Sequence, residues 1–335
     1  MREVFVLKNL LMFLALTTAF TVSAAQKVNG AGATFPYPIY SKWFAEYQKT
    51  HKDVEFNYQS IGSGGGIKQV LAQTVDFGAT DAPMTDEELK SAKTPIRHIP
   101  TVLGAVVVAY NVTGVPGELK LDGATLANIF LGTVTKWNDA AIVKLNPKVK
   151  LPATDILVVR RSDGSGTSAV FTEYLAAVSP DFKTKVGVGK NVNWPAGIGA
   201  KGNEGVTAMV SQTDGAIGYT ELAYAINSKL NVASMKNAKG DFTIPSVASI
   251  TAAASSVKKF DGDLRMSIIN ADAKGAYPIS SFTYILLPED KASAPLKEVR
   301  AFLGWALKEG QTFAAELHYA PLPKKMSESL LKTLK

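Results

Sequence analysis

The chain has 335 residues, of which 46% are hydrophobic and 19% charged, and these proportions exclude a disordered or fibrous protein. A chain of this length can bury a large core and is expected to divide into two lobes or domains. It has no cysteine, which excludes disulfides, thiolate metal sites and a lipid-modified N-terminal cysteine. The formal net charge is +7, but the lysines are spread without basic runs, so we expect no nucleic-acid partner.

The first residues have the pattern of a secretory signal peptide. MREVFVLK carries two cations, the apolar run NLLMFLALTTAFTVSA follows, and small residues come at Ser23, Ala24 and Ala25. The apolar run is shorter than the ~20 residues that a membrane-spanning helix needs. Export with cleavage after Ala24 or Ala25 is therefore a better prediction than a membrane anchor. We expect residues 1–25 to be a signal peptide and the mature protein to lie free in a bacterial periplasm.

The segments after the signal alternate between strand-like and helix-like patterns. Alternation or continuous β-branched runs predict strands at 54–58, 76–79, 98–112, 155–160 and 280–288. Helical spacing predicts helices at 39–47, 67–73, 85–92, 122–132, 165–178, 203–212 and from 299 onward, and residues 215–227 are predicted as a strand followed by a helix. This alternation predicts an α/β architecture. The lysine-rich end, from Lys324, is predicted to be a solvated tail.

Three loops that precede predicted helices share a composition of glycine and hydroxyl residues. They are GAGATFP at 30–36, GSGGG at 62–66 and DGSGTS at 163–168. The N-terminus of a helix carries unpaired N–H groups and a partial positive charge, so it favours an anion. Glycine lets the backbone approach a ligand, and Ser or Thr adds a hydroxyl donor. One such loop predicts only a helix cap, but three of them, with Arg161 beside the last, favour convergence on one anion.

Charged residues near these loops indicate which anion. Arg161 or Arg160 offers a two-pronged guanidinium donor, which Asp163 is placed to hold. Asp81 has only acceptors when it is ionised, so it would repel sulfate but accept the hydroxyl of an oxyanion that keeps a proton, such as phosphate. Alternatively, Asp81 is a turn residue before Pro83. The charges favour phosphate, provided that Asp81 faces the anion.

Enzymes and other binding proteins are the alternatives. The nucleophile motif G-x-S-x-G needs a glycine where the chain has Asp163, and the phosphate-loop motif G-x-x-x-x-G-K-[ST] does not match GSGGGIKQ. The three histidines have no metal-ligand spacing. We therefore expect no enzyme, no metal and no cofactor. A secreted phosphate-ester hydrolase is the weaker alternative, and a binding protein for sulfate, molybdate or tungstate is the closer one.

Five stretches together resemble one known family. GAGATFP, GSGGG, VDFGATDAP, RRSDGSGTS and GAIGYTE, in this order and at these intervals, are similar to the periplasmic phosphate-binding proteins of the bacterial Pst uptake system. The resemblance covers most of the mature chain. It implies a type II periplasmic-binding-protein fold with two lobes, each a mixed β-sheet flanked by helices, and a two-crossing hinge. It also implies a monomer that binds inorganic phosphate and meets an inner-membrane ABC permease complex.

The resemblance further implies the residues of the site. Backbone N–H groups and hydroxyls would hold the phosphate, Asp81 would accept its proton, and Asp163 would hold the guanidinium of Arg161. The implied phosphate ligands are Ala33, Thr34, Phe35, Ser63, Asp81, Arg161, Ser165, Gly166 and Thr167. Gly64 departs from relatives that carry a second serine there, and Arg160 is expected to be solvated or paired elsewhere.

The expected lobes follow from the two crossings of the hinge. Lobe I would comprise residues 26–101 and 280–335, and lobe II residues 102–279. The implied ligands up to Asp81 then fall on lobe I, and those from Arg161 onward fall on lobe II. A ligand held between them would couple binding to closure of the hinge.

Overall fold

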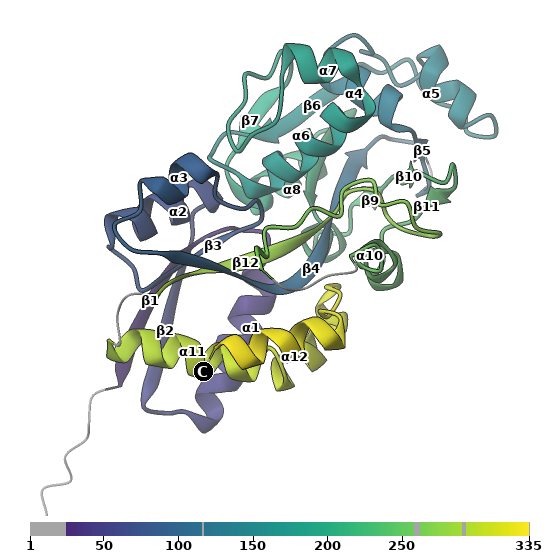
Figure 1. The fold of residues 1–335 in the computed structure, drawn as a ribbon. Helices are drawn as coiled ribbons and strands as arrows, with labels where there is room; N and C mark the ends of the chain where they lie inside the picture. The colour runs from purple at the N-terminus through teal and green to yellow at the C-terminus, as the bar shows by residue number, and fades with distance from the viewer. Residues whose placement is uncertain (1–24, 116, 258–261, 290–292, 335) are drawn as a thin grey trace, which may run out of the picture.

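The computed structural model describes residues 25–115, 117–257, 262–289 and 293–334. The predicted signal peptide falls on residues 1–25 and, apart from its last residue, lies outside the described residues. Within the described ranges, no helix has both the length and the apolar character that a membrane crossing requires. Alternating helices and strands fill two bodies (Figure 1), so the predicted α/β architecture is confirmed.

The strands and helices have the following bounds. The strands are β1 Gln26–Gly32, β2 Val54–Ser60, β3 Phe77–Thr80, β4 Ile96–Asn111, β5 Lys120–Leu121, β6 Leu157–Arg161, β7 Ile198–Ala200, β8 Ala216–Glu221, β9 Asn231–Val232, β10 Ser234–Lys236, β11 Phe242–Thr243 and β12 Ser280–Pro288. The helices are α1 Tyr37–Thr50, α2 Ser63–Ala72, α3 Asp86–Lys90, α4 Gly123–Phe130, α5 Ala140–Leu145, α6 Gly166–Val178, α7 Pro180–Lys185, α8 Gly202–Gln212, α9 Leu222–Asn227, α10 Val247–Ala254, α11 Ala294–Ala306 and α12 Lys324–Thr333, with 3₁₀ turns η1 Glu309–Phe313 and η2 Ala315–Leu317.

One mixed sheet runs through both bodies in the order β2-β1-β3-β12-β4-β8-β6-β7, with β9 also beside β4. Toward one end of this sheet, β1 lies parallel to β2 and β3, and toward the other end β6 lies parallel to β8 and β7. The long strand β4 joins the bodies, because it pairs with β12 as far as Ala105 and with β8 from Val106 onward. Its apolar, β-branched sequence suits this position, where nearly every residue is buried.

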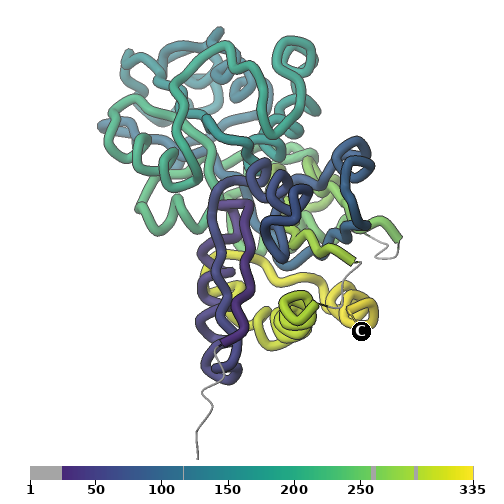
Figure 2. The backbone as a smooth tube through the Cα atoms, turned by 90° about the vertical axis from the view of Figure 1, so that its left-hand side faces the viewer, coloured from purple at the N-terminus to yellow at the C-terminus, as the bar shows by residue number. Residues whose placement is uncertain are grey.

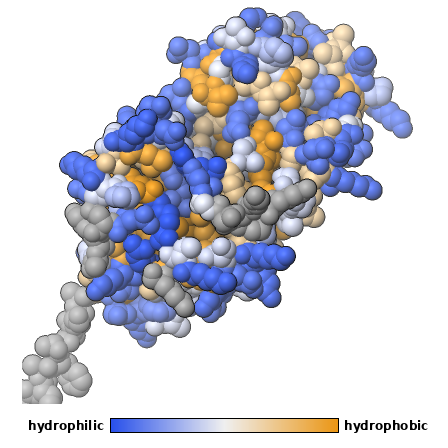
Figure 3. Space-filling view, in the orientation of Figure 1, coloured by the Kyte–Doolittle hydropathy of each residue, from blue (hydrophilic) through white to orange (hydrophobic). Residues whose placement is uncertain are grey.

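The first strand and the last helix, β1 and α12, lie in the same body. Figure 2 shows β1 and the C-terminal helices together below the second body, which is formed by the middle of the chain. We call these the first body (β1–β3, α1–α3, α11 and α12) and the second body (β6–β8 and α4–α9). On the face seen in Figure 3, polar side chains cover most of both bodies, with smaller apolar patches between them.

The C-terminal segment differs from its prediction. The lysine-rich end is not a solvated tail, because it forms α12 and buries Met326 and Leu330. The apolar residues recur at helical spacing, while Lys325 and Lys332 lie on the exposed face. The prediction of a tail was wrong because it considered the number of lysines and not the helical spacing of the apolar residues between them.

Helix α2 begins at Ser63, four residues earlier than predicted. Three successive glycines disfavour a helix when the backbone is free. At Gly66, however, a side chain would lie 2.5 Å from the carbonyl oxygen of Ala31 and from Cα of Gly32, so the helix can pack on β1 only because this residue is glycine. The GSGGG stretch is therefore the first turn of a helix, and Ser63 lies at its N-terminus.

Candidate functional site

The predicted loops leave the sheet at one edge. Strand β1 ends at Gly32, which lies beside Ser60 of β2 and Ala79 of β3. Because these three strands are parallel, the segments that follow them emerge side by side. In the second body, β6 ends at Arg161 and leads into α6. The structure brings all three glycine-hydroxyl loops to the junction of the two bodies.

Every predicted ligand residue is buried there. The side chains of Thr34, Ser63, Asp81, Arg161, Ser165 and Thr167 are at most 3% exposed, and Ala33, Phe35 and Gly166 are buried as well. Burying hydroxyls, a cation and a carboxyl group is unfavourable unless they have polar partners. A cluster of this kind is expected at a binding site and not in an ordinary core.

The two bodies touch at the site. The backbone N–H of Gly64 in the first body donates to the carbonyl of Gly164 in the second at 2.8 Å. A Cβ on Gly166 would lie 2.6 Å from Oδ2 of Asp81, and the hydroxyl of Ser63 is closer still. Lys190 and Glu88 form an ion pair of 3.0 Å across the same junction. The structure therefore has the loops of both bodies in direct contact.

Asp163 fixes one edge of the Arg161 guanidinium. Its carboxylate accepts from Nε at 2.7 Å and from Nη2 at 2.5 Å, and it also accepts the backbone N–H of Gly202 at 3.1 Å. Burial opposes ionisation of Asp163, but the hydrogen bonds and charge of Arg161 outweigh it and lower the pKa of this carboxyl group. Nη1 of Arg161 is buried and has no hydrogen-bond partner among the described residues. Asp163 thus fixes the Nε–Nη2 edge of the guanidinium, and Nη1 on the other edge remains available as a donor.

Asp81 is buried and held by two hydroxyl groups. Its Oδ1 accepts from the hydroxyl of Thr283 at 2.9 Å, and its backbone N–H donates to the hydroxyl of Ser63 at 3.2 Å. Burial raises the pKa of Asp81 to about 7, although the Thr283 hydrogen bond and the charge of Arg161 act in the opposite direction. Both protonation states are therefore accessible near neutral pH, unlike those of an exposed turn aspartate.

Two helix N-termini add further donors. Ser165 caps α6 by accepting the N–H of Ser168 at 3.0 Å, while Gly166 and Thr167 form the first turn of that helix. Helix α2 begins at Ser63 without a side-chain cap. The N–H groups of both first turns and the dipoles of both helices favour an anion between them.

Three residues near the site were not predicted. Nδ2 of Asn203 on α8 donates a hydrogen bond to the hydroxyl of Thr34 at 2.7 Å. The hydroxyl of Tyr219 accepts the backbone N–H of Arg161 at 3.1 Å. Thr283 on β12 holds Asp81. None of them lies near a glycine-hydroxyl loop in the sequence. Tyr219 lies in the GAIGYTE stretch and Asn203 in a glycine-containing segment, which are weak signals. The packing of α8 on β6 and β8 and the pairing of β8 and β12 with β4 bring the three side chains to the site.

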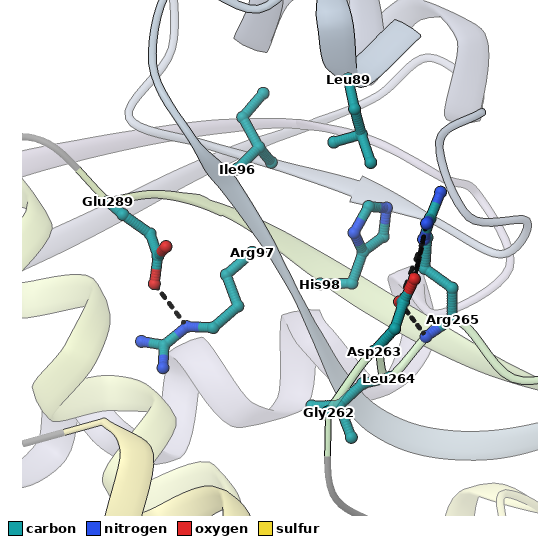
Figure 4. A pocket seen from close by; sticks show the side chains of 9 residues that line it. All are labelled: Leu89, Ile96, Arg97, His98, Gly262, Asp263, Leu264, Arg265 and Glu289. Carbon is teal, nitrogen blue, oxygen red and sulfur yellow. Dashed lines mark hydrogen bonds and ion pairs between the residues drawn. The ribbon is translucent and has the colours of Figure 1, made fainter. Parts of the chain in front are cut away.

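The structure also has a cavity of about 260 Å³ away from the predicted ligands (Figure 4). Its charged groups pair with one another: Arg97 lies 3.1 Å from Glu289, Arg265 binds Asp263, and His98 lies between the two pairs. Burial lowers the pKa of His98 to about 4, so the ring is neutral at pH 7. Within the described ranges, no three histidine or carboxylate side chains gather as metal ligands.

Comparison with known proteins shows the family. A family model described as a PBP superfamily domain matches residues 18–309. The phosphate-binding protein PstS of Xylella fastidiosa strain Temecula1 is 46% identical over 307 residues, which cover 91% of this chain and 84% of that protein.

Solved structures share the two-lobe fold. The periplasmic phosphate-binding protein PfluDING, solved with bound phosphate, has a TM-score of 0.72 at 21% identity and covers 91% of this chain and 93% of its own. An ABC-type phosphate transport receptor from Vibrio cholerae has a TM-score of 0.58 at 19% identity and covers 88% of this chain and 100% of its own. These two likenesses concern the fold alone. The sequence matches establish that the chain belongs to the PBP superfamily and, within it, to the family of phosphate-binding proteins named PstS.

Proposed function

We propose that this chain binds inorganic phosphate in a bacterial periplasm and delivers it to an inner-membrane ABC permease. One observation carries the proposal. A buried guanidinium edge, several hydroxyls and two helix N-termini, all of which can donate hydrogen bonds, lie together with a single carboxyl group, which can accept one. A phosphate that keeps one proton needs many donors and one acceptor, which is the balance that these groups offer. The names of the related proteins support the same ligand, and we propose no catalytic step.

The proposed roles follow from the geometry. Nη1 of Arg161 and the N–H groups of Ser63, Gly166 and Thr167, at the starts of α2 and α6, donate to phosphate oxygens. Asp81 accepts the phosphate hydroxyl. The proposed ligands are Ala33, Thr34, Phe35, Ser63, Asp81, Arg161, Ser165, Gly166 and Thr167, with Asp163 as the residue that orients Arg161. Donors to a charged group contribute about 1.5–3 kcal/mol each, and association costs about 4–15 kcal/mol. A micromolar or tighter dissociation constant is expected.

We propose that binding closes two lobes, with residues 26–101 and 280–335 as lobe I and residues 102–279 as lobe II. The first and second bodies of the fold support this division, as does the change of partner along β4 between Ala105 and Val106, a few residues after the proposed crossing. The contact of Gly64 with Gly164 supports a closed arrangement. A closed pair of lobes gives the permease a surface that depends on occupancy.

Titration calorimetry on residues 26–335, freed of bound ligand, tests the proposal. We expect one phosphate per chain and no detectable sulfate binding at neutral pH. Tight sulfate or molybdate binding would assign the chain to another oxyanion. No binding of either anion to the folded protein would overturn the proposed function.

Asp81→Asn is expected to reduce the ratio of phosphate to sulfate affinity by at least about a hundredfold. The amide loses one acceptor for the phosphate hydroxyl and gains two N–H donors that suit a fully deprotonated anion, and a change of about 1.4 kcal/mol alters each affinity tenfold. Competition between the two anions at pH 7 measures the ratio. Asp122→Asn is the matched control, because Asp122 only caps α4 and asparagine caps equally well. An unchanged ratio in the Asp81 variant would remove the role given to this residue.

A further inference from the structure

One amide connects hydroxyls from the two bodies. Asn203 is fully buried at the start of α8, in the second body. Its Nδ2 donates to Oγ1 of Thr34 in the first body at 2.7 Å and to Oγ1 of Thr167 at 3.3 Å. Its backbone N–H donates to the same Thr34 oxygen at 3.3 Å. Both hydroxyls belong to the proposed phosphate ligands.

The orientation of this amide follows from its other end. The atom opposite Nδ2 lies 3.2 Å from the backbone nitrogen of Glu221 and 3.2 Å from the hydroxyl of Thr220. A backbone N–H can only donate, so the amide atom that faces Glu221 is the oxygen. A flipped amide would set two N–H donors against each other in a buried site, which is costly. The NH₂ group therefore faces Thr34 and Thr167.

This orientation determines what Thr34 can offer to a ligand. A hydroxyl has two acceptor lone pairs and one hydrogen. The two N–H groups of Asn203 occupy both lone pairs of Thr34, so its hydrogen remains as the group available to a ligand. Thr167 receives one bond from the same amide, which biases its hydroxyl in the same sense. Without this amide, each of the two hydroxyls would have a lone pair that could face a ligand, although the backbone N–H of residue 203 would still donate to Thr34.

We propose that Asn203 is a positioning residue that makes the Thr34 and Thr167 hydroxyls donors and thereby restricts the site to anions whose oxygens accept hydrogen bonds. The inference rests on the proposed phosphate binding and deepens it. Because the amide belongs to the second body and Thr34 to the first, the donor arrangement is complete only when the bodies are in contact. Contact between the two bodies therefore sets the Thr34 hydroxyl as a hydrogen-bond donor, and Asn203 is the residue through which it does so.

Asn203→Asp tests this role, because the side chain keeps its shape while the NH₂ donors become an acceptor oxygen. The Thr34 hydroxyl would then donate to the side chain of residue 203, and one lone pair would stay with the backbone N–H of that residue while the other turns toward the ligand. Calorimetry is expected to give at least about tenfold weaker phosphate binding than in the wild type, as for the loss of one hydrogen bond to a charged group. Asn203→Ala, which leaves the hydroxyls free to rotate, is expected to lose less affinity than Asn203→Asp and serves if the aspartate variant does not fold.

Asn237→Asp is the matched control. Asn237 is a buried amide in the middle part of the chain that donates to Thr243 at 3.0 Å and accepts the N–H of Asp241 at 3.0 Å, away from the predicted ligands. Thermal unfolding of the ligand-free variants measures how much stability is lost when a carboxylate replaces a buried amide. We expect the Asn237 variant to lose stability but to keep wild-type phosphate affinity.

A double variant separates positioning from mere support of the fold. If Asn203 acts through the hydroxyl of Thr34, Asn203→Asp must cost less affinity in a Thr34→Val background, where that hydroxyl is absent. An equal loss in both backgrounds, or phosphate affinity within about threefold of the wild type in Asn203→Asp, would overturn the inference while the proposed function stands. A wild-type protein that binds no phosphate would overturn both.

Discussion

Arg161→Ala is expected to weaken phosphate binding by at least about a hundredfold. The variant loses the Nη1 donor and leaves the partly buried carboxylate of Asp163 without its cationic partner, close to where the anion would lie. A hydrogen bond to a charged group contributes about 1.5–3 kcal/mol, and the repulsion from Asp163 adds to that loss. Each 1.4 kcal/mol corresponds to a tenfold change in affinity. Titration calorimetry with phosphate measures the effect.

Arg160→Ala is the matched control, because it removes the same charge one residue away. Successive side chains of a strand point to opposite faces, and Nη1 of Arg160 lies 3.4 Å from the carbonyl oxygen of Arg161, at the limit of a hydrogen bond. We expect its phosphate affinity to stay within about threefold of the wild type. Equal losses in the two variants would mean that net charge, and not the fork of Arg161, attracts the anion.

Gly166→Ala is expected to lower phosphate affinity by at least about a hundredfold for a steric reason. The new Cβ would lie 2.6 Å from Oδ2 and 2.8 Å from Cβ of Asp81, with the Ser63 hydroxyl nearer still. These atoms belong to the other body, so the clash acts against contact between the bodies and not against the folding of either one. Alanine also favours the helix that begins here. Binding is measured by calorimetry, and folding by the thermal unfolding of the ligand-free protein.

Gly205→Ala serves as the control for a glycine change in a helix. A Cβ at Gly205 would meet Ala200 at 3.6 Å, which is an ordinary contact, and so this variant should bind phosphate as the wild type does. If Gly166→Ala also bound as the wild type does, the close approach of the two bodies would not be part of binding. A large loss of stability in the ligand-free Gly166 variant would likewise contradict the account.

The sequence predicted the features that depend on local chemistry. Glycine and hydroxyl residues before helices marked the loops that contain Thr34, Ser63 and Ser165, and the structure brings these loops together. The apolar, β-branched run at 98–112 predicted a strand, and the structure confirms it as β4. Each of these features is encoded within a few residues, so a single sequence contains it.

The sequence could not predict the features that depend on distant pairing. Thr283 reaches the site because β12 pairs with β4, and Asn203 because α8 packs on β6 and β8, and neither arrangement is visible in any one segment. The raised pKa of Asp81 requires burial, which depends on the contact of the two bodies. The free edge of Arg161 depends on where Asp163 lies in space. Tertiary structure, more than local propensity, sets the electrostatics of the site.

A crystal structure of residues 26–335 grown with phosphate tests the central claim most directly. The account predicts one phosphate between the two bodies, within hydrogen-bond distance of Nη1 of Arg161 and of the hydroxyls of Thr34, Ser63 and Thr167, with one oxygen beside the carboxyl group of Asp81. A phosphate held elsewhere, for example between Arg97 and Arg265, or one that touches a single body and leaves Asp81 without contact, would contradict it.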